Sequence, residues 1–370
     1  MKNIYLEAYI ADNLGDDLFL YILAQRYPDA AIHIYSRQTS AASLPPNIRF
    51  VMTKRERKLI DLLNFADAVL NKFSVPSHLS RGYMEWRKRK LMKKADAVVY
   101  LTGSGFMENK SVLQSDAFYR SGPFVLGCNF GPYFSNVFFR KCRGHFSMAS
   151  DVCFRDFYSE QLFRDLPNVR REMDIVFGYG GGAGNPLPGD FGPYVLISVM
   201  NLGNSAENGR VYSAYLRFIK NCIAVLLNRK KRIVLIGFCR AERDALAVEE
   251  ILSGFEGNDA IVSFQYPEIS IEQAAGLFRY ADSVIATRYH SVVLGMLFQK
   301  TVYPIAYSEK TVHVLKDIDS GVKYAEINRL ESLEADAFLA EYGFRISDRR
   351  RKEIRESAER QFSELDKKMM

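Results

Sequence analysis

Short apolar runs alternate with longer amphipathic runs along the whole of this 370-residue chain. Apolar runs of four to nine residues are typical of buried strands, whereas apolar residues at helical spacing are typical of amphipathic helices. In the first part of the chain we predict strands at residues 2–10, 31–36, 48–52, 97–101, 124–129 and 151–154, with a helix at 16–27. In the second part we predict strands at 194–200, 232–238, 260–266 and 283–286, with helices at 211–227, 241–252 and 270–280. This alternation predicts parallel sheets with helices on both faces.

A segment rich in Gly and Pro, residues 178–193, interrupts the alternation. It superficially fits a dinucleotide-binding Gly-x-Gly-x-x-Gly loop, but no helix can start cleanly across its Asn-Pro-Leu-Pro sequence, so the phosphate-binding geometry is missing. We interpret it as a linker between two Rossmann-like domains, residues 1–177 and 194–340. The basic residues 341–370 predict a C-terminal helix that packs back on the first domain.

A short sequence recurs at corresponding places in the two predicted domains. Residues 95–99 read Ala-Asp-Ala-Val-Val and residues 281–285 read Ala-Asp-Ser-Val-Ile, each between a predicted helix and a predicted strand. We interpret the two as equivalent corners of two similar halves.

The composition is that of a globular protein, with 48% hydrophobic and 25% charged residues. No segment approaches the roughly 20 apolar residues that a membrane-spanning helix needs, and Glu7 falls where a signal sequence would be apolar. We therefore expect a cytoplasmic protein. The five Cys and five His show no metal-ligand spacing, so we expect no metal site built by the protein.

The segment of residues 81–94, which begins at Arg81 and ends at Lys94, is strongly basic. It holds seven Lys or Arg, one acid, and the single Trp of the chain, Trp86. Basic residues with interfacial aromatic residues fit a surface that contacts anionic lipid, which predicts a peripheral position on the inner membrane face. The alternative is a solvated helix face. Nucleic-acid binding is disfavoured because no recognised module is present.

An Arg and a His follow the apolar strand predicted at residues 283–286. Since side chains alternate along a strand, Arg288 and His290 are predicted on one face and Tyr289 on the other. Ligands of open α/β sheets bind at the carboxyl ends of strands, and a fixed cation beside an imidazole suits an anionic substrate that must be protonated. The alternative is that local carboxylates satisfy both residues.

The residues around this strand resemble the polysaccharide pyruvyl transferase family. The resemblance rests first on Arg288-x-His290-Ser291, then on Gln299 to Pro304, and then on Tyr307-x-x-Lys310. Four more elements are similar to those of the family: Asn13-x-Gly15-Asp16, Gly127 to Pro132, Arg155-Asp156-x-x-Ser159, and Asp174. The chain departs from the family in having Thr102-Gly103-Ser104-Gly105 for a Gly-Gly-Gly turn, and Phe238-Cys239-Arg240 with Asp244 where many members have a His followed by an Asp.

The resemblance implies two domains facing across a cleft, as in GT-B glycosyltransferases. It also implies transfer of a pyruvyl group from phosphoenolpyruvate to a sugar of a surface polysaccharide or its lipid-linked precursor, forming a ketal without a cofactor or metal. His290 would then be the general acid and Arg288 the principal anion clamp, with Arg155 and Lys310 as supporting cations. An ion pair with a neighbouring acid is the alternative for Arg155.

The loop after the first strand is expected to face the acceptor sugar. Asn13, Asp16 and Asp17 are its polar residues, and Asp16 is the candidate base toward a hydroxyl. The alternative is ordinary capping of the first helix.

Two other functions share these features. A nucleotide-sugar-dependent glycosyltransferase would have the same fold, and Asp317-Ile318-Asp319 is a formal Asp-x-Asp metal motif, although it lies outside any predicted sheet edge. A non-catalytic family member in a polysaccharide assembly complex would keep the fold without turnover.

Overall fold

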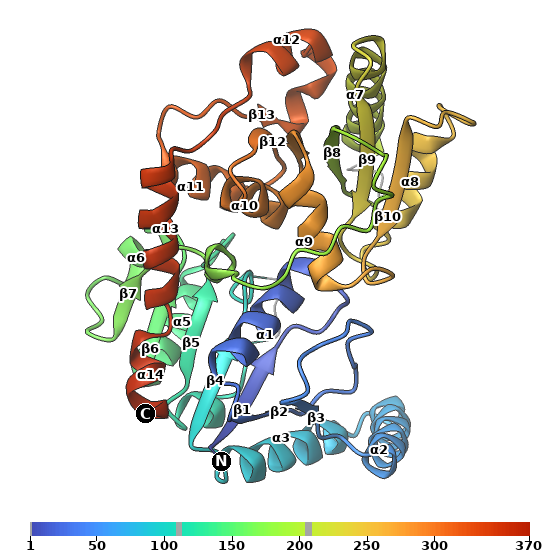
Figure 1. The fold of residues 1–370 in the computed structure, drawn as a ribbon. Coiled ribbons are helices and arrows are strands. Elements are labelled where there is room, and N and C mark those ends of the chain that lie inside the picture. The colour runs from blue at the N-terminus through green and yellow to red at the C-terminus, as the bar shows by residue number, and fades with distance from the viewer. Residues whose placement is uncertain (1, 109–112, 204–208) are drawn as a thin grey trace.

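The computed structural model describes residues 2–108, 113–203 and 209–370, and these form two parallel β-sheets (Figure 1). The first sheet has the strand order β3-β2-β1-β4-β5-β6-β7 and the second the order β10-β9-β8-β11-β12-β13. The first sheet comprises β1 (Asn3–Ala8), β2 (Ala31–Ile34), β3 (Ile48–Phe50), β4 (Ala97–Leu101), β5 (Phe124–Cys128), β6 (Asp151–Phe154) and β7 (Val169–Arg171). The second comprises β8 (Tyr194–Val199), β9 (Arg232–Gly237), β10 (Ile261–Gln265), β11 (Ser283–Ala286), β12 (Thr301–Ala306) and β13 (Ala325–Glu326). The predicted fold class is confirmed.

Helices cover both faces of the sheets. Those of the first half are α1 (Leu14–Arg26), α2 (Lys54–Lys72), α3 (Leu79–Met92), α4 (Asp116–Tyr119), α5 (Asn136–Met148), α6 (Phe157–Phe163) and the 3₁₀ helix η1 (Ile175–Gly178). The second half has α7 (Gly209–Asn228), α8 (Asp244–Leu252), α9 (Ile271–Tyr280), α10 (Tyr289–Leu297), α11 (Glu309–Ile318), η2 (Ile327–Ser332) and α12 (Ala335–Glu341). The chain ends with α13 (Asp348–Arg360) and α14 (Ser363–Met369).

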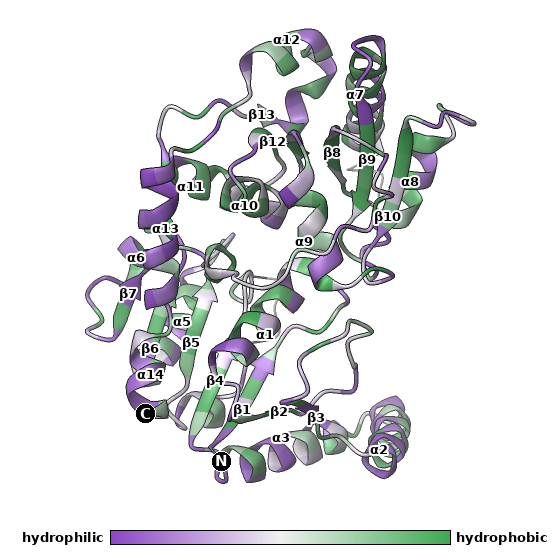
Figure 2. Ribbon diagram, in the orientation of Figure 1, coloured by the Kyte–Doolittle hydropathy of each residue, from purple (hydrophilic) through white to green (hydrophobic). Residues whose placement is uncertain are grey.

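Local sequence explains where these elements begin and what they bury. All residues of β4, β5 and β8 are buried, as expected for strands covered on both faces, and these strands are mostly hydrophobic in Figure 2. Thr53 and Ser270 each form a capping box with the residue three positions later, which starts α2 and α9. The predicted cap at Ser270 is confirmed.

The two sheets have matching corners where the strand order reverses. In the first sheet the backbone N–H of Asp96 donates to Asn3 at 2.8 Å, and in the second Asp282 donates to Tyr194 at 2.9 Å. The recurring Ala-Asp-x-Val sequence therefore marks the same corner twice, directly before β4 and β11. In a doubly wound sheet, ligands bind in the crevice beyond the carboxyl ends of the strands between which the order reverses.

The C-terminal helices return to the first half of the molecule, where Figure 1 shows α13 and α14 beside β6 and β7. The Gln361 side chain accepts from the Gly127 N–H at 3.1 Å and donates to the Met173 carbonyl at 3.2 Å. Arg26 of α1 forms an ion pair with Asp366 of α14 at 2.6 Å. At the start of α13, the Gln299 side chain of the second half donates to Asp348 at 2.7 Å, so the tail contacts both halves.

Direct hydrogen bonds also join the two halves at the carboxyl edge of the first sheet. Leu14 N–H donates to the Phe238 carbonyl at 3.0 Å, and the Tyr266 hydroxyl donates to Asp17 at 2.8 Å. This junction is where the candidate residues gather.

Candidate active site

Arg155 lies directly after β6 and is almost completely buried, with 2% of its surface exposed. Its terminal nitrogens donate to Asp174 and to Asn129, each at 2.8 Å. The guanidinium also lies over the ring of Tyr289, 4.1 Å from the centroid. Gly103 permits this position, because a Cβ atom there would come within 3.2 Å of Nη1. A cation in this setting is held rigidly and is poorly solvated, which strengthens its attraction for an anion.

Asp174 links Arg155 to the second half of the molecule. It accepts the Val176 N–H at 2.8 Å and the Tyr289 hydroxyl at 3.2 Å. His290 Nε2 lies 3.8 Å from Oδ2, too far for a hydrogen bond, so this attraction is electrostatic. Burial alone would raise the pKa of Asp174, but His290, Arg155 and the Val176 N–H together hold it at about 2. Asp174 is therefore a permanent carboxylate at neutral pH.

His290 lies in the first turn of α10, and its ring reaches across to α1. It meets the ring of Phe19 edge-on, with 5.4 Å between centroids. A Cβ atom at Gly15 would fall 1.8 Å from His290 Nδ1, so only glycine fits there. Nε2 is buried and forms no hydrogen bond within the described ranges. The imidazole is thus fixed in place while one nitrogen is left without a protein partner there.

Lys310 and Asp16 complete a cluster of polar and charged side chains that also contains Arg155, Asp174 and His290. Lys310 lies in the first turn of α11, with Nζ 3.4 Å from the Ser104 hydroxyl of the first half. Asp16 lies in the first turn of α1. Burial raises the pKa of Asp16, and the neighbouring His290, Lys310 and Arg155 oppose that rise. A carboxyl group with a raised pKa is better suited to exchange a proton than an ordinary surface acid.

Three helices begin around this cluster, namely α1, α10 and α11. Among the described residues, the side chains of Arg288 and Ser308 make no capping hydrogen bond to α10 and α11, whereas Asn13 caps α1. Helix N-termini carry partial positive charge and free N–H groups, so they attract anions. The arrangement combines three helix ends with the cations Arg155 and Lys310.

Arg288 has different partners. Its Nε donates to Asp244 at 3.1 Å, its Nη2 binds the second oxygen of the same carboxylate, and its Nη1 pairs with Glu242. Asp244 is 1% exposed, whereas the Glu242 side chain is 46% exposed. The prediction that Arg288 and His290 share one face of a strand is wrong, because β11 ends at Ala286 and α10 has begun by residue 289.

Two of the residues expected to face the acceptor, Asn13 and Asp17, have hydrogen-bond partners within the protein. The Asn13 side chain caps α1 by accepting the Gly15 N–H at 3.0 Å. Asp17 accepts from Tyr266 at 2.8 Å and from Ser40 at 3.2 Å. Burial raises the pKa of Asp17 to about 7, although these hydrogen bonds oppose the rise. Of the three polar loop residues, Asp16 alone reaches the cluster.

Sequence reasoning assigns no role to Asp174 or Tyr289, which the structure places at the centre of the cluster. The sequence matches Asp174 only to a family position, and its contact with Arg155 spans 19 residues and a change of strand. Strand alternation predicts Tyr289 on the opposite face from His290, yet both side chains approach Asp174. In the sequence Tyr289 lies between the candidates Arg288 and His290, whereas Asp174 is 19 positions from Arg155, so adjacency to a candidate identifies only Tyr289.

The Asp-x-Asp motif at the end of α11 has structural contacts as well. Asp317 accepts the Phe157 N–H at 2.7 Å, and Asp319 accepts the Gly321 N–H at 2.8 Å. In the ranges that the structure describes, no group of three His, Cys, Asp or Glu side chains is arranged to hold a metal ion.

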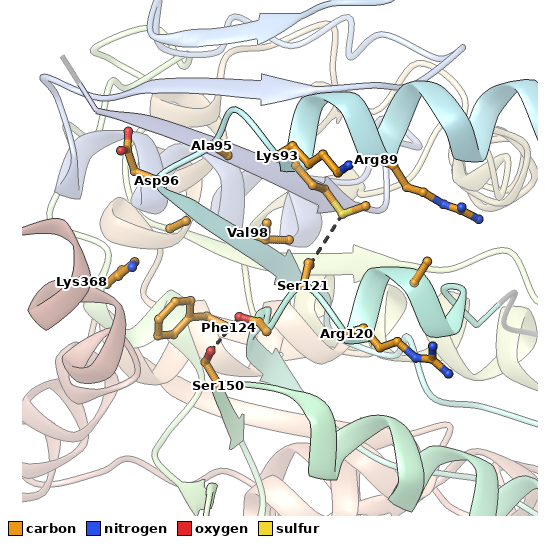
Figure 3. Close-up of a pocket in the computed structure, with 14 residues that line it drawn as sticks. Arg89, Lys93, Ala95, Asp96, Val98, Arg120, Ser121, Phe124, Ser150 and Lys368 are labelled. Atoms are coloured by element: carbon orange, nitrogen blue, oxygen red, sulfur yellow. Dashed lines mark hydrogen bonds between the residues drawn. The ribbon is translucent and has the colours of Figure 1, made fainter.

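Two cavities lie away from the cluster. One of about 630 Å³ is lined by residues of α3, α4 and the starts of β4 and β5 (Figure 3). The other, of about 650 Å³, lies between the end of α11 and the start of α13. None of the seven candidate residues lines either cavity.

The two parallel sheets and the junction between them define the GT-B class of architecture. The chain is similar in fold to a UDP-GlcNAc 2-epimerase from Methanocaldococcus jannaschii, with a TM-score of 0.55, 12% identity, and coverage of 99% of this chain and 100% of that one. It is also similar to Anabaena Alr3699/HepE, solved in complex with UDP-glucose, with a TM-score of 0.51, 13% identity, and coverage of 100% and 98%. Identities this low establish the fold alone.

The family follows from the sequence. The polysaccharide pyruvyl transferase family model matches residues 13–309, which is well over half of the chain, so this protein belongs to that family and is a transferase. No match is found among curated proteins.

Proposed function

We propose that this protein transfers a pyruvyl group from phosphoenolpyruvate to two hydroxyls of a sugar in a surface polysaccharide or its lipid-linked precursor. The proposal is supported by one observation above the others. Arg155, Lys310 and His290 converge with Asp16 at a junction where three helices begin. Phosphoenolpyruvate carries a carboxylate and a phosphate, and a site for it needs several fixed positive groups.

The chemistry assigns a role to each of these groups. His290 donates a proton to the methylene carbon of phosphoenolpyruvate, which leaves the central carbon oxocarbenium-like. One sugar hydroxyl adds to that carbon and gives its proton to Asp16. The carbon–oxygen bond to phosphate then breaks, phosphate leaves with the bonding electrons, and the second hydroxyl adds with loss of its proton. The two hydroxyl protons balance the proton gained by the methyl group and the one taken up by phosphate.

The cations stabilise the negative charge of the donor. Arg155 and Lys310 are best placed to hold it, because Arg155 is paired with only one carboxylate and Lys310 contacts a neutral hydroxyl. Fixed cations in a poorly solvated site stabilise developing charge without reorganising. The Asp174 carboxylate keeps both Arg155 and His290 in position.

Arg288 is proposed to bind the donor after a local rearrangement. Its contact with the buried Asp244 fixes the guanidinium, whereas the half-exposed Glu242 occupies the remaining nitrogen. When a substrate carboxylate displaces Glu242, the Arg288 guanidinium is already oriented to bind it, because the contact with Asp244 remains. In this proposal Glu242 occupies the place of the substrate anion until the donor binds.

The proposal is tested by incubating the protein with phosphoenolpyruvate and candidate lipid-linked or free sugars. Phosphate release together with a pyruvyl mass increment on the sugar is the expected result. Transfer from a nucleotide sugar, with no use of phosphoenolpyruvate, would instead identify a glycosyltransferase. Binding of neither donor would identify a non-catalytic member of the family.

A further inference from the structure

The α2–α3 hairpin, defined as residues 54–94, carries the whole net positive charge of this protein. It holds twelve Lys or Arg and four Asp or Glu, a net charge of +8, whereas the complete chain has a net charge of +7. The other 329 residues together therefore carry a net charge of −1. In Figure 1 the hairpin lies at the lower margin of the molecule, with the second sheet at the top.

An apolar stripe runs along the exposed side of α2. Its members are spaced three or four residues apart, which places them on one face of the helix. They are Leu59, Leu62, Phe65, Val69 and Phe73 (which directly follows α2), exposed by 38%, 63%, 68%, 38% and 74%. By contrast, α2 buries only Ile60 and Asp67. Figure 2 shows both hydrophobic and hydrophilic residues on this helix. A contiguous exposed apolar stripe of this kind marks a contact surface.

Unpaired cations accompany the apolar stripe. Lys54, Arg55, Lys58 and Lys72 of α2 are exposed and form no ion pair with any residue that the structure describes. On α3, Lys90 Nζ lies 3.9 Å from the ring centroid of Trp86, which is 47% exposed. Apolar and cationic side chains thus share one outer surface.

The positive surface continues past the C-terminal end of α3. There Arg89 and Lys93 line the cavity of about 630 Å³ together with Arg120 and Lys368 (Figure 3). The one acid of that lining, Asp96, accepts the Asn3 N–H at 2.7 Å.

We propose that the α2–α3 hairpin binds reversibly to the surface of an anionic bilayer. The apolar stripe would enter the boundary between headgroups and acyl chains, and the surrounding cations would contact anionic headgroups. In the described ranges no helix has the length and apolar character to cross a bilayer, so the contact is with the surface. The proposal is independent of the pyruvyl transfer proposed above.

Charge selects the bilayer over other occupants. If the hairpins of two copies paired about a two-fold axis, two surfaces of net charge +8 would face each other, and like charges oppose such pairing. Nucleic acid would satisfy the cations but not five exposed aliphatic and aromatic residues. An anionic bilayer satisfies both kinds of side chain.

The only Trp in the chain makes the test direct, because intrinsic fluorescence excited at the Trp band reports on the hairpin alone. The full-length protein is mixed with phosphatidylcholine vesicles, with or without 30% phosphatidylglycerol, and the samples are then separated by flotation. We expect flotation and a blue shift of Trp86 emission with the anionic vesicles, reversed by salt, and neither effect with pure phosphatidylcholine.

Two sets of variants separate the two contributions. The triple variant Leu62→Ser, Phe65→Ser, Phe73→Ser and the triple variant Lys54→Gln, Lys58→Gln, Lys72→Gln should each lower partitioning by tenfold or more. Matched controls change exposed residues outside the hairpin. These are Phe134→Ser with Val137→Ser and Leu246→Ser, and Lys230→Gln with Lys316→Gln and Lys352→Gln. The controls should partition like the wild type.

The proposal is overturned if the wild type stays unbound with anionic vesicles at low salt, or if the apolar variant partitions like the wild type. A wild-type dimer that becomes a monomer in the apolar variant, without vesicle binding by either, would assign the apolar stripe to self-association. Light scattering on the same samples measures that outcome.

Discussion

Arg155 and Arg288 are both buried cations beside the junction of the two halves, but their surroundings differ. Arg155 donates to one carboxylate and one neutral amide, with Lys310 and His290 nearby. Arg288 is shared between two carboxylates, Asp244 and Glu242. The groups around Arg155 therefore have a neutral or positive net charge, whereas Arg288 and its two carboxylates have a negative net charge. Under our proposal, the number of neighbouring carboxylates, rather than burial, determines which arginine can receive the anionic substrate without first losing a partner.

His290 belongs to the Arg155 side of this comparison, and its loss should have the largest effect. If His290 is the general acid, His290→Gln lowers turnover by about 10²–10⁴ with the fold intact. His78→Gln is the matched control, because His78 is exposed and its side chain does not cap α3. Steady-state rates and circular dichroism measure both effects. Near-normal turnover in His290→Gln would remove this residue from the mechanism.

Substituting each arginine by lysine sharpens the comparison directly. An ammonium cannot reproduce the planar, two-point contact of a guanidinium, so Arg155→Lys should weaken phosphoenolpyruvate binding by about 10–100-fold. Arg288→Lys should also weaken binding, but by less if Glu242 must first be displaced. Calorimetry on both variants measures the difference. Equal binding by the wild type and Arg155→Lys would move the clamp to Arg288.

Asp174, the ion-pair partner of Arg155, should make the free energy of unfolding depend on pH in acid. The pKa of Asp174 is about 2 in the folded protein and 3.8 in the unfolded chain. Its carboxylate therefore stabilises the folded state fully above pH 4, and this contribution is lost as the pH falls toward 2. The shift corresponds to about 2 kcal/mol. Asp174→Asn keeps an acceptor for Arg155 but should lose this acid dependence of the free energy of unfolding. Parallel acid unfolding curves for both proteins would contradict the assignment.

Substitution of Glu242 should have the smallest effect on donor binding, and it should tighten binding where the arginine substitutions weaken it. If this carboxylate occupies the place of the substrate anion, Glu242→Gln should tighten phosphoenolpyruvate binding by a few fold, because a neutral amide competes less well for Arg288. Glu331→Gln is a control, since Glu331 pairs with two arginines at the exposed surface. Weaker binding by Glu242→Gln would show that Glu242 positions Arg288 instead.

Local sequence predicted much of the fold, because alternating apolar runs and capping residues act over short distances. The strands at residues 97–101 and 151–154 have the predicted bounds, and the helix capped by Ser270 begins as expected. The repeated Ala-Asp-x-Val sequence also marks equivalent corners, since the first six strands of the seven-stranded sheet follow the same order as the six strands of the second sheet.

The site was harder to predict because its geometry depends on contacts between the halves. Continued strand alternation over residues 287–290 predicts Arg288 and His290 on one face, whereas the chain turns into α10 there and separates their side chains. The sequence indicates Gly15 only as part of a turn. The structure shows that a side chain is excluded at this position by the ring of His290, which lies 275 positions later. Asp244 belongs to a departure from the family pattern, and nothing in the local sequence indicates that it pairs with Arg288.

The central claim, that the cluster around Arg155 and His290 binds the pyruvyl donor, is tested most directly by titrating phosphoenolpyruvate and UDP separately into the wild-type protein. We expect phosphoenolpyruvate to bind, with its affinity reduced in Arg155→Lys and Lys310→Gln and largely kept in His290→Gln. Binding of UDP without binding of phosphoenolpyruvate would contradict the claim and assign this site to a nucleotide sugar.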